Sequence, residues 1–183
     1  MILLTTSRRP TRRIRTLCQD FARCVPKVVR INRGKLNLDE IAERALEINA
    51  DRVIVVDRWK GGPGKIKLFL TEPTGLSPVP PLMYVAGIRL QREFEKETKP
   101  VRSLDVTTAL GNSPEVMKIA EHLSNFLNVP MLSMNEAVSK YRASMRVSHN
   151  GSGRIQITFM LFPQMVEIGH RITISRVVWE ART

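Results

Sequence analysis

The stretch ILLTTSRRPTRRIRTLCQDFAR, residues 2–23, decides the fold class of this chain. Its first five residues, ILLTT, form a short apolar run that is typical of a buried strand. From about Pro10 to Arg23, apolar side chains recur at the spacing of one helix face, which predicts a helix. That stripe consists of Ile14, Leu17, Cys18, Phe21 and Ala22. A strand followed directly by an amphipathic helix favours an α/β protein.

The start of this helix carries an unusual concentration of positive charge. A helix dipole places partial positive charge at that end, so each cation there costs about 0.3–1 kcal/mol. A bound phosphate would reverse the balance, because guanidinium forks and free backbone N–H groups both bind phosphate. We therefore predict a phosphate-backbone site rather than a solvated helix face. The predicted residues are Ser7, Arg8, Arg9, Arg12, Arg13 and Arg15.

Later segments extend the α/β pattern. KVVRI, RVIVVDRW and KIKLFL predict strands, and MYVAGIRLQREFE predicts a long strand that ends in charge. Asn37 and Glu40 predict a capped second helix. The Pro-rich TEPTGLSPVPP predicts a connection without regular structure.

The chain also predicts two similar halves, residues 1–95 and 100–183, joined by KETKPV. Five features recur in the same order, which indicates an internal duplication. They are Thr5-Thr6 with Thr107-Thr108, Val25-Pro26 with Val129-Pro130, Asn37 with Asn135 as helix starts, GPGKIKLF with GSGRIQIT, and AGIRLQREFE with IGHRITISRVVWE. The second half has ALGNSPE where the first has its arginines, and RVSHNGSGRIQITFMLF predicts a hairpin.

The overall charge favours an anionic partner. The chain has 183 residues and a formal net charge of +12, and residues 1–35 hold ten Lys or Arg against a single acid. Nucleic acid fits this asymmetry better than a membrane surface, because the basic helix has no excess of large apolar residues. No apolar run is long enough to span a membrane. Cys18 and Cys24 are expected to be reduced thiols, so we expect a cytoplasmic protein.

Two further basic loops are expected beside the arginine cluster. The loops after successive parallel strands meet at one edge of an α/β sheet. We therefore predict that SRRP, NRGK and RWKGGPGK form one basic surface. The additional residues are Arg30, Arg33, Lys35, Arg58, Lys60 and Lys65. Trp59 is expected either to stack on a base or to pack in the protein.

No enzyme pattern occurs in the sequence. WKGGPGK does not match the phosphate loop of nucleotide hydrolases, because the first glycine is missing and Ile66 replaces Ser or Thr. The three histidines and two cysteines have no metal-ligand spacing. Asp57 ends an apolar strand, but we expect it to pair with Arg58. We therefore expect no catalytic residue, metal or cofactor.

The segments TTSRRP, RINRGK and VIVVDRWKGGPGKI together resemble the Brix-domain family of ribosome-biogenesis proteins, in particular its short archaeal members. The resemblance implies a non-enzymatic protein that binds rRNA or pre-rRNA and acts in pre-rRNA processing or ribosomal subunit assembly. It also implies other assembly proteins as partners, and two halves that each resemble an anticodon-binding domain of aminoacyl-tRNA synthetases.

One segment departs from the resemblance. Eukaryotic members carry an HLP.GPT-like segment after the glycine-rich turn, where this chain has LFLTEPTGL.

The strand and helix pattern and the two similar halves together predict an α/β fold, with two tandem half-domains of mixed sheets and flanking helices. The alternative function is a tRNA-directed anticodon-binding module or an accessory protein of a synthetase.

Overall fold

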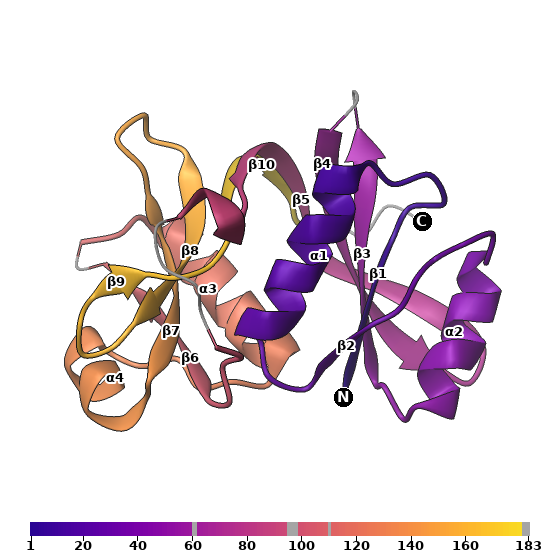
Figure 1. The fold of residues 1–183 in the computed structure, drawn as a ribbon, viewed down its shortest axis with the longest axis horizontal. Coiled ribbons are helices and arrows are strands. Elements are labelled where there is room, and N and C mark those ends of the chain that lie inside the picture. The colour runs from indigo at the N-terminus through magenta and orange to yellow at the C-terminus, as the bar shows by residue number, and fades with distance from the viewer. Residues whose placement is uncertain (60–61, 95–98, 110, 181–183) are drawn as a thin grey trace. The chain divides into compact units, whose positions relative to one another are not determined.

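The structure is a computed structural model, and it describes residues 1–59, 62–94, 99–109 and 111–180 (Figure 1). The chain forms two compact units. Unit 1 consists of Met1–Ala22, Lys27–Val85 and the residues from Arg176 onward, and unit 2 consists of Arg23–Pro26 and Ala86–Ser175. The predicted halves, 1–95 and 100–183, differ from these units because short pieces of each half belong to the other unit.

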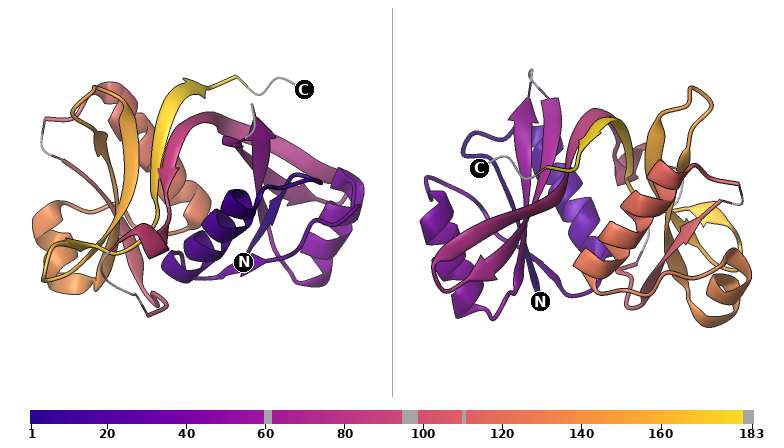
Figure 2. Two further views of the ribbon diagram at one scale, coloured as in Figure 1. Left: turned by 45° about the horizontal axis from the view of Figure 1, so that its top comes forward. Right: turned by 180° about the vertical axis from the view of Figure 1, so that it is seen from behind.

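Unit 1 is built on a mixed sheet with the strand order β2-β1-β3-β4-β5. Strand β1 pairs in parallel with β2 and β3, and the later pairs are antiparallel. Strand β1 therefore lies between its two parallel neighbours in the strand order, and the ribbon of unit 1 is drawn in Figures 1 and 2. The elements are β1 (Ile2–Thr6), α1 (Arg12–Cys24), β2 (Val28–Arg30), α2 (Leu38–Glu47), β3 (Arg52–Trp59), β4 (Gly62–Glu72) and β5 (Gly75–Arg89).

The core of unit 1 lies on both faces of its sheet. On one face Leu3 and Val53 pack against Ile41 of α2. The neighbouring strand residues Ile2 and Leu4 point to the opposite face and are equally buried. A strand buried on both faces reads as a continuous apolar run, which is why ILLTT was recognisable as a strand. We infer that the buried stripe of α1 covers this second face.

The two helices of unit 1 begin at polar caps. The N–H of Ile14 donates to Thr11 Oγ1, so Thr11 caps α1 and the helix starts two residues after Pro10. The helix thus begins two residues after the approximate start predicted at Pro10, because Thr11 offers a side-chain acceptor that proline lacks. The predicted capping box of Asn37 and Glu40 is confirmed at the start of α2.

The Pro-rich segment contains only a short turn at residues 73–74, and from Gly75 onward it belongs to strand β5, so its assignment as an irregular connection is wrong there. Glu72 pairs with Gly75 at a tight hairpin, and Gly75 takes a φ of 132°, which favours glycine. The register then shifts: Leu68 pairs with Val79 but Ile66 pairs with Met83. This irregularity accommodates Pro80 and Pro81, which have no N–H to donate to the ladder.

In unit 2 the strand order is β10-β8-β7-β6. Strand β7 pairs in parallel with β6 and antiparallel with β8, and β8 also pairs antiparallel with β10. The hairpin predicted from RVSHNGSGRIQITFMLF is confirmed as β7 and β8. The elements are the short 3-10 helix Gln91–Glu93, β6 (Leu104–Thr108), α3 (Pro114–Leu127), α4 (Met134–Lys140), β7 (Ala143–His149), β8 (Ile155–Leu161), β9 (Val166–Glu167) and β10 (Arg171–Val178).

Helix α4 begins one residue earlier than predicted. Its cap is Ser133, which forms a capping box with Glu136, and Asn135 lies inside the helix. The match between Asn37 and Asn135 as helix starts is therefore wrong. The signal Ser-x-x-Glu was present in the sequence and describes the cap better.

The two units have the same order of strands. In unit 2 Met131 forms a parallel bridge to Val106 of β6, in the place that β2 occupies beside β1. Each unit then continues through one parallel pair and two antiparallel pairs. The internal duplication itself stays a prediction.

The core of unit 2 contains a close approach between three elements. Gly169 precedes β10, and a Cβ atom placed there would lie 2.9 Å from Cys24 Sγ and 3.0 Å from Phe159 Cβ. The ring of Phe159 lies 4.6 Å from that of His170, which is fully buried. Glycine at this position allows Cys24 and Phe159 to approach the backbone.

A polar cluster is buried between β6 and β7. Ser144 Oγ donates to Asp105 Oδ2 at 3.1 Å and lies 2.9 Å from Thr107 Oγ1. All three side chains are fully buried. Burial raises the pKa of the Asp105 carboxyl to about 6, against the lowering effect of Ser144.

Candidate nucleic-acid interface

The carboxyl ends of β1, β2 and β3 lie together, as the parallel pairing predicts. The N–H of Ser7 donates to Val56 O at 3.1 Å, and the N–H of Arg58 donates to Ser7 Oγ at 3.3 Å. On the other side of β1, Thr5 Oγ1 donates to Ile31 O at 3.2 Å. The segments SRRP, RINRGK and VVDRW are therefore adjacent in unit 1.

We call this edge of unit 1 the basic edge. It comprises the predicted residues that the structure describes at or after the ends of these three strands and in the first turns of α1. They are Ser7, Arg8, Arg9, Arg12, Arg13, Arg15, Arg30, Arg33, Lys35 and Arg58.

The arginines around the start of α1 are exposed, and the first turn of the helix contains no acid. Arg12 and Arg15 share the outward face with Gln19, whereas Ile14 and Leu17 point into the core. Within the described part of the chain, no ion pair joins Arg8, Arg12 or Arg15 to a carboxylate. These positive charges are therefore available to an external anion.

Arg33 lies in the middle of the basic edge but is only 7% exposed. Its Nε donates to Leu36 O at 2.6 Å, which holds the loop after β2. Burial lowers the pKa of the Arg33 guanidinium, and the positive charge of Arg8 lowers it further, whereas the negative charge of Asp57 raises it. Arg8 and Asp57 are therefore both close enough to Arg33 to interact with it. The geometry gives Arg33 a role in positioning this loop, and its predicted RNA contact stays a prediction.

Arg30 and Lys35 flank that buried arginine. Arg30 Nη2 donates to Asn32 Oδ1 at 2.9 Å, which orients the guanidinium in its own loop. Arg30 also interacts with Cys18 of α1. Burial raises the pKa of the Cys18 thiol to about 12, against the lowering effect of the positive charge of Arg30. Lys35 and Arg58 are exposed. The basic edge thus combines side chains held by the loops with side chains open to solvent.

Asp57 does not pair with Arg58, contrary to the prediction. Its Oδ2 lies 2.6 Å from Lys67 Nζ on the neighbouring strand β4. The alternation of the strand explains the partner, because Lys67 and Asp57 lie on one face of the sheet while Arg58 points to the other. The alternating KIKLFL already placed Lys65 and Lys67 on a common face.

Strands β3 and β4 form an antiparallel hairpin, in which Trp59 pairs with Gly62. Lys60, which we predicted as an RNA contact, lies outside the described residues. Both predicted roles of the Trp59 side chain, stacking on a base and packing in the protein, stay predictions. Lys65 is half-buried and its Nζ lies 5.2 Å from the centre of the Tyr84 ring.

Sequence reasoning missed two residues near Lys65. Tyr84 of β5 lies opposite Lys65 of β4, and the guanidinium of Arg176 lies 4.2 Å from the centre of the Tyr84 ring. Both belong to unit 1. The signal was weak, because Tyr84 sits in an apolar run and Arg176 lies near the other end of the sequence.

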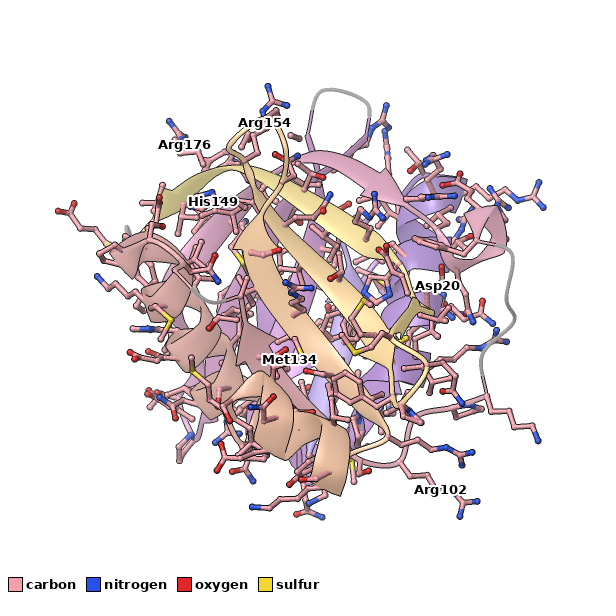
Figure 3. The ribbon with its side chains drawn as sticks, turned by 90° about the vertical axis from the view of Figure 1, so that its left-hand side faces the viewer. Asp20, Arg102, Met134, His149, Arg154 and Arg176 are labelled. Carbon is pink, nitrogen blue, oxygen red and sulfur yellow. The ribbon has the colours of Figure 1, made fainter. Side chains whose placement is uncertain are left out.

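Unit 2 carries a different set of side chains at the equivalent helix start. Ser113 caps α3, and its Oγ lies 2.9 Å from His149 Nε2. His149 Nδ1 donates to Gly153 O at 3.0 Å, within the hairpin that also carries Arg154 (Figure 3). The helix start of unit 2 is thus closed by its own hairpin rather than lined by arginines.

Within residues 1–59, 62–94, 99–109 and 111–180, no three Cys, His, Asp or Glu side chains gather to hold a metal ion. None of the helices in those ranges is long and apolar enough to cross a membrane.

The chain is similar to curated archaeal proteins, although no family model matches it. It is 35% identical over 113 residues to a "Probable Brix domain-containing ribosomal biogenesis protein" of Pyrococcus horikoshii, covering 60% of this chain and 50% of that protein. A protein of the same name from Methanopyrus kandleri is 29% identical over 175 residues, covering 91% of this chain and 88% of that protein. The chain spans about half the length of the first curated relatives that it matches.

Two solved structures have the same fold. A "probable ribosomal biogenesis protein from Aeropyrum pernix K1" superposes with a TM-score of 0.81 at 22% identity, covering 96% of this chain and 95% of that one. An "archaeal Imp4-like protein" superposes with a TM-score of 0.68 at 19% identity, covering 98% of this chain and 100% of that one. The predicted resemblance and the predicted α/β class are therefore confirmed.

Proposed function

Because this chain is a homologue of archaeal Brix domain-containing proteins, we propose that it acts in ribosome biogenesis by binding rRNA or pre-rRNA at the basic edge of unit 1. The observation that carries the proposal is the exposure of the arginines around the start of α1, of which Arg8, Arg12 and Arg15 form no ion pair with a carboxylate in the described chain. A phosphate at this position would interact favourably with the guanidinium groups and with the helix dipole.

The arrangement of cations on the basic edge suits the phosphate backbone of RNA better than a single anion. Exposed cations follow both β1 and β3, and Arg58 donates its N–H to Ser7, so these two segments are fixed beside each other. Contacts to successive phosphates supply affinity without reading the sequence of the RNA. We therefore propose a binding mode that recognises the RNA backbone first, with other ribosome-assembly proteins as further partners.

We further propose that the protein is not an enzyme. Asp57, the carboxylate at the end of an apolar strand, is engaged by Lys67 at 2.6 Å. The glycine-rich turn departs from the phosphate-loop pattern at Ile66. A carboxylate held in an ion pair next to such a turn has no evident catalytic partner among the described residues.

The decisive experiment is crosslinking of the full chain to RNA in a lysate of its host, followed by sequencing of the bound RNA. Enrichment of rRNA and pre-rRNA over tRNA is the expected result. Affinities measured with an rRNA fragment and a tRNA of equal length at several salt concentrations would then rank the two partners. Preferential recovery of tRNA would overturn the proposal in favour of an anticodon-binding module.

A further inference from the structure

The face of the sheet that carries Asp57 also carries a row of cations. Lys65 of β4 lies opposite Asp57 of β3, and Tyr84 of β5 lies opposite Lys65. Residues directly opposite each other on paired strands point to the same face. Asp57, Lys65 and Tyr84 therefore form a line across three neighbouring strands.

This line is connected to the basic edge. Asp57 interacts electrostatically with Arg33, and Arg33 interacts in turn with Arg8. Lys67, two residues from Lys65 on the same face, holds the Asp57 carboxylate. Positive side chains thus lead from Arg8 across the sheet toward Tyr84.

Tyr84 lies at the far end of the row, beside two cations. The guanidinium of Arg176 lies 4.2 Å from the centre of its ring, and Lys65 Nζ lies 5.2 Å from it. Hydrogen bonding from Arg176 lowers the pKa of the Tyr84 hydroxyl, and Lys65 lowers it further. Both cations are therefore held against the tyrosine.

Arg176 is open to solvent. Its side chain projects away from its strand (Figure 3), and it forms no ion pair with a carboxylate in the described chain. A guanidinium over an aromatic ring is held in place while its other side stays accessible. Such a plane stacks readily on a nucleobase, as does the face of an aromatic ring.

We propose that Tyr84 and Arg176 form a stacking site for an unpaired base, so that this protein prefers single-stranded segments of its RNA to duplex. The inference rests on the proposed function and names the class of RNA that the same surface binds. A row of cations that tracks a backbone and ends at an aromatic side chain is the general arrangement for binding single strands. A duplex would contact the cations but would offer no exposed base to Tyr84 and Arg176.

The experiment compares the full chain with three variants, Tyr84→Leu, Tyr84→Phe and Arg176→Gln. Tyr141→Leu is the matched control, because it removes the other tyrosine of the chain. The probes are a fluorescein-labelled 12-nucleotide oligoadenylate RNA, the same strand with abasic riboses, and a 12-base-pair RNA duplex. Binding is measured by anisotropy at several salt concentrations, with folding checked by circular dichroism.

Tyr84→Leu should weaken binding to the oligoadenylate about five- to 150-fold, the range for loss of one stacked base. Its binding to the abasic strand and to the duplex should not change, and its salt dependence should equal that of the unchanged protein. Tyr84→Phe should retain most of the affinity. Arg176→Gln should weaken oligoadenylate binding and reduce the salt slope by about 0.7.

Equal affinity of Tyr84→Leu and Tyr141→Leu for the oligoadenylate would overturn the stacking site. The same holds if Tyr84→Leu loses affinity equally for all three probes, since that would reflect a disturbed fold. Failure of the unchanged protein to bind any of these RNAs would instead overturn the proposed function itself.

Discussion

The ammonium group of Lys67 lies 2.6 Å from a carboxylate oxygen of Asp57, on the sheet face that also carries Lys65. This ion pair places one negative charge inside a row of positive ones. Because both side chains are partly exposed, the pair contributes no more than about 1 kcal/mol to folding. The larger effect of the Asp57 carboxylate is to make the electrostatic potential of this surface less positive.

The substitution Asp57→Asn is therefore expected to strengthen RNA binding. The change removes a charge that repels phosphate and releases Lys67 to contact it. The affinity for single-stranded RNA should rise several-fold at low salt, and the salt slope should become steeper by up to about 0.7. Anisotropy titrations at several salt concentrations measure both. A weaker-binding but folded Asp57→Asn variant would contradict this electrostatic account.

The same substitution tests for nucleotide hydrolysis. Purified protein with RNA should show no ATP turnover above background, and Asp57→Asn should give the same value. Release of inorganic phosphate is the measurement, with protein-free buffer as the reference. Turnover that Asp57→Asn abolishes would revive a catalytic role for this carboxylate.

The exposed arginines around the start of α1 provide the main test of the interface. Replacing Arg8, Arg9 and Arg12 together with Gln should weaken RNA binding regardless of sequence and flatten the salt slope by up to about two units. The matched control is the triple change of Arg102, Arg142 and Arg154 to Gln, which removes the same charge from exposed positions in unit 2.

Thermal unfolding should separate this effect from any loss of structure. The triple variant of unit 1 should be as stable as the unchanged protein or slightly more stable, because it removes cations from the positive end of a helix dipole. If both triple variants lose affinity equally, net charge rather than the basic edge accounts for binding.

The fold was predictable where a local pattern was strong. The apolar run of β1 and the capping box at Asn37 each specified their element without help from the rest of the chain. The strand across Pro80 and Pro81 was not predictable, because only the irregular register with β4 makes prolines acceptable there. Tertiary context outweighed local propensity at that position.

The candidate site was predictable to a similar degree. Parallel pairing brought Ser7 and Arg58 together, as the order of strands and helices indicated. The partner of Asp57 required the register between β3 and β4, and the contact of Tyr84 with Arg176 joins positions more than ninety residues apart. Such pairings depend on the arrangement of strands, which no short sequence window contains.

Gly169 provides a prediction about the core of unit 2. In Gly169→Ala the new methyl group would lie 2.9 Å from Cys24 Sγ and 3.0 Å from Phe159 Cβ, so these buried atoms must move. Overpacking of this kind costs about 1–3 kcal/mol. The control is Gly87→Ala, since a Cβ atom there meets nothing within 4 Å. Urea unfolding should show a lower midpoint for Gly169→Ala alone, and equal midpoints would contradict the tight contact.

Asp105 predicts a specific pH dependence of stability. Burial raises the pKa of its carboxyl to about 6 in the folded protein, from 3.8 as the ordinary value. The folded state therefore favours the protonated form, and this contribution is complete below about pH 4 and lost as the pH rises through 6. Relative to Asp105→Asn, the unchanged protein should lose up to about 3 kcal/mol of unfolding free energy between pH 4 and pH 7.5.

The comparison between variants is needed because His170 acts in the opposite direction. Burial lowers the pKa of His170 to about 3 from 6.5, so its contribution is complete above about pH 6.5 and is lost as the pH falls. The difference between the unchanged protein and Asp105→Asn cancels this effect. A difference in unfolding free energy that is constant from pH 4 to pH 7.5 would contradict the shifted pKa of Asp105.

The interleaved composition of the two units has a consequence for synthesis. Unit 1 needs residues from Arg176 onward as well as its N-terminal segments, whereas most of unit 2 is one continuous piece from Ala86 to Ser175. During translation every residue of unit 2 is added to the chain before the last segment of unit 1 is made. The earlier-made unit is thus completed last, and Tyr84 acquires its neighbour Arg176 only at that final stage.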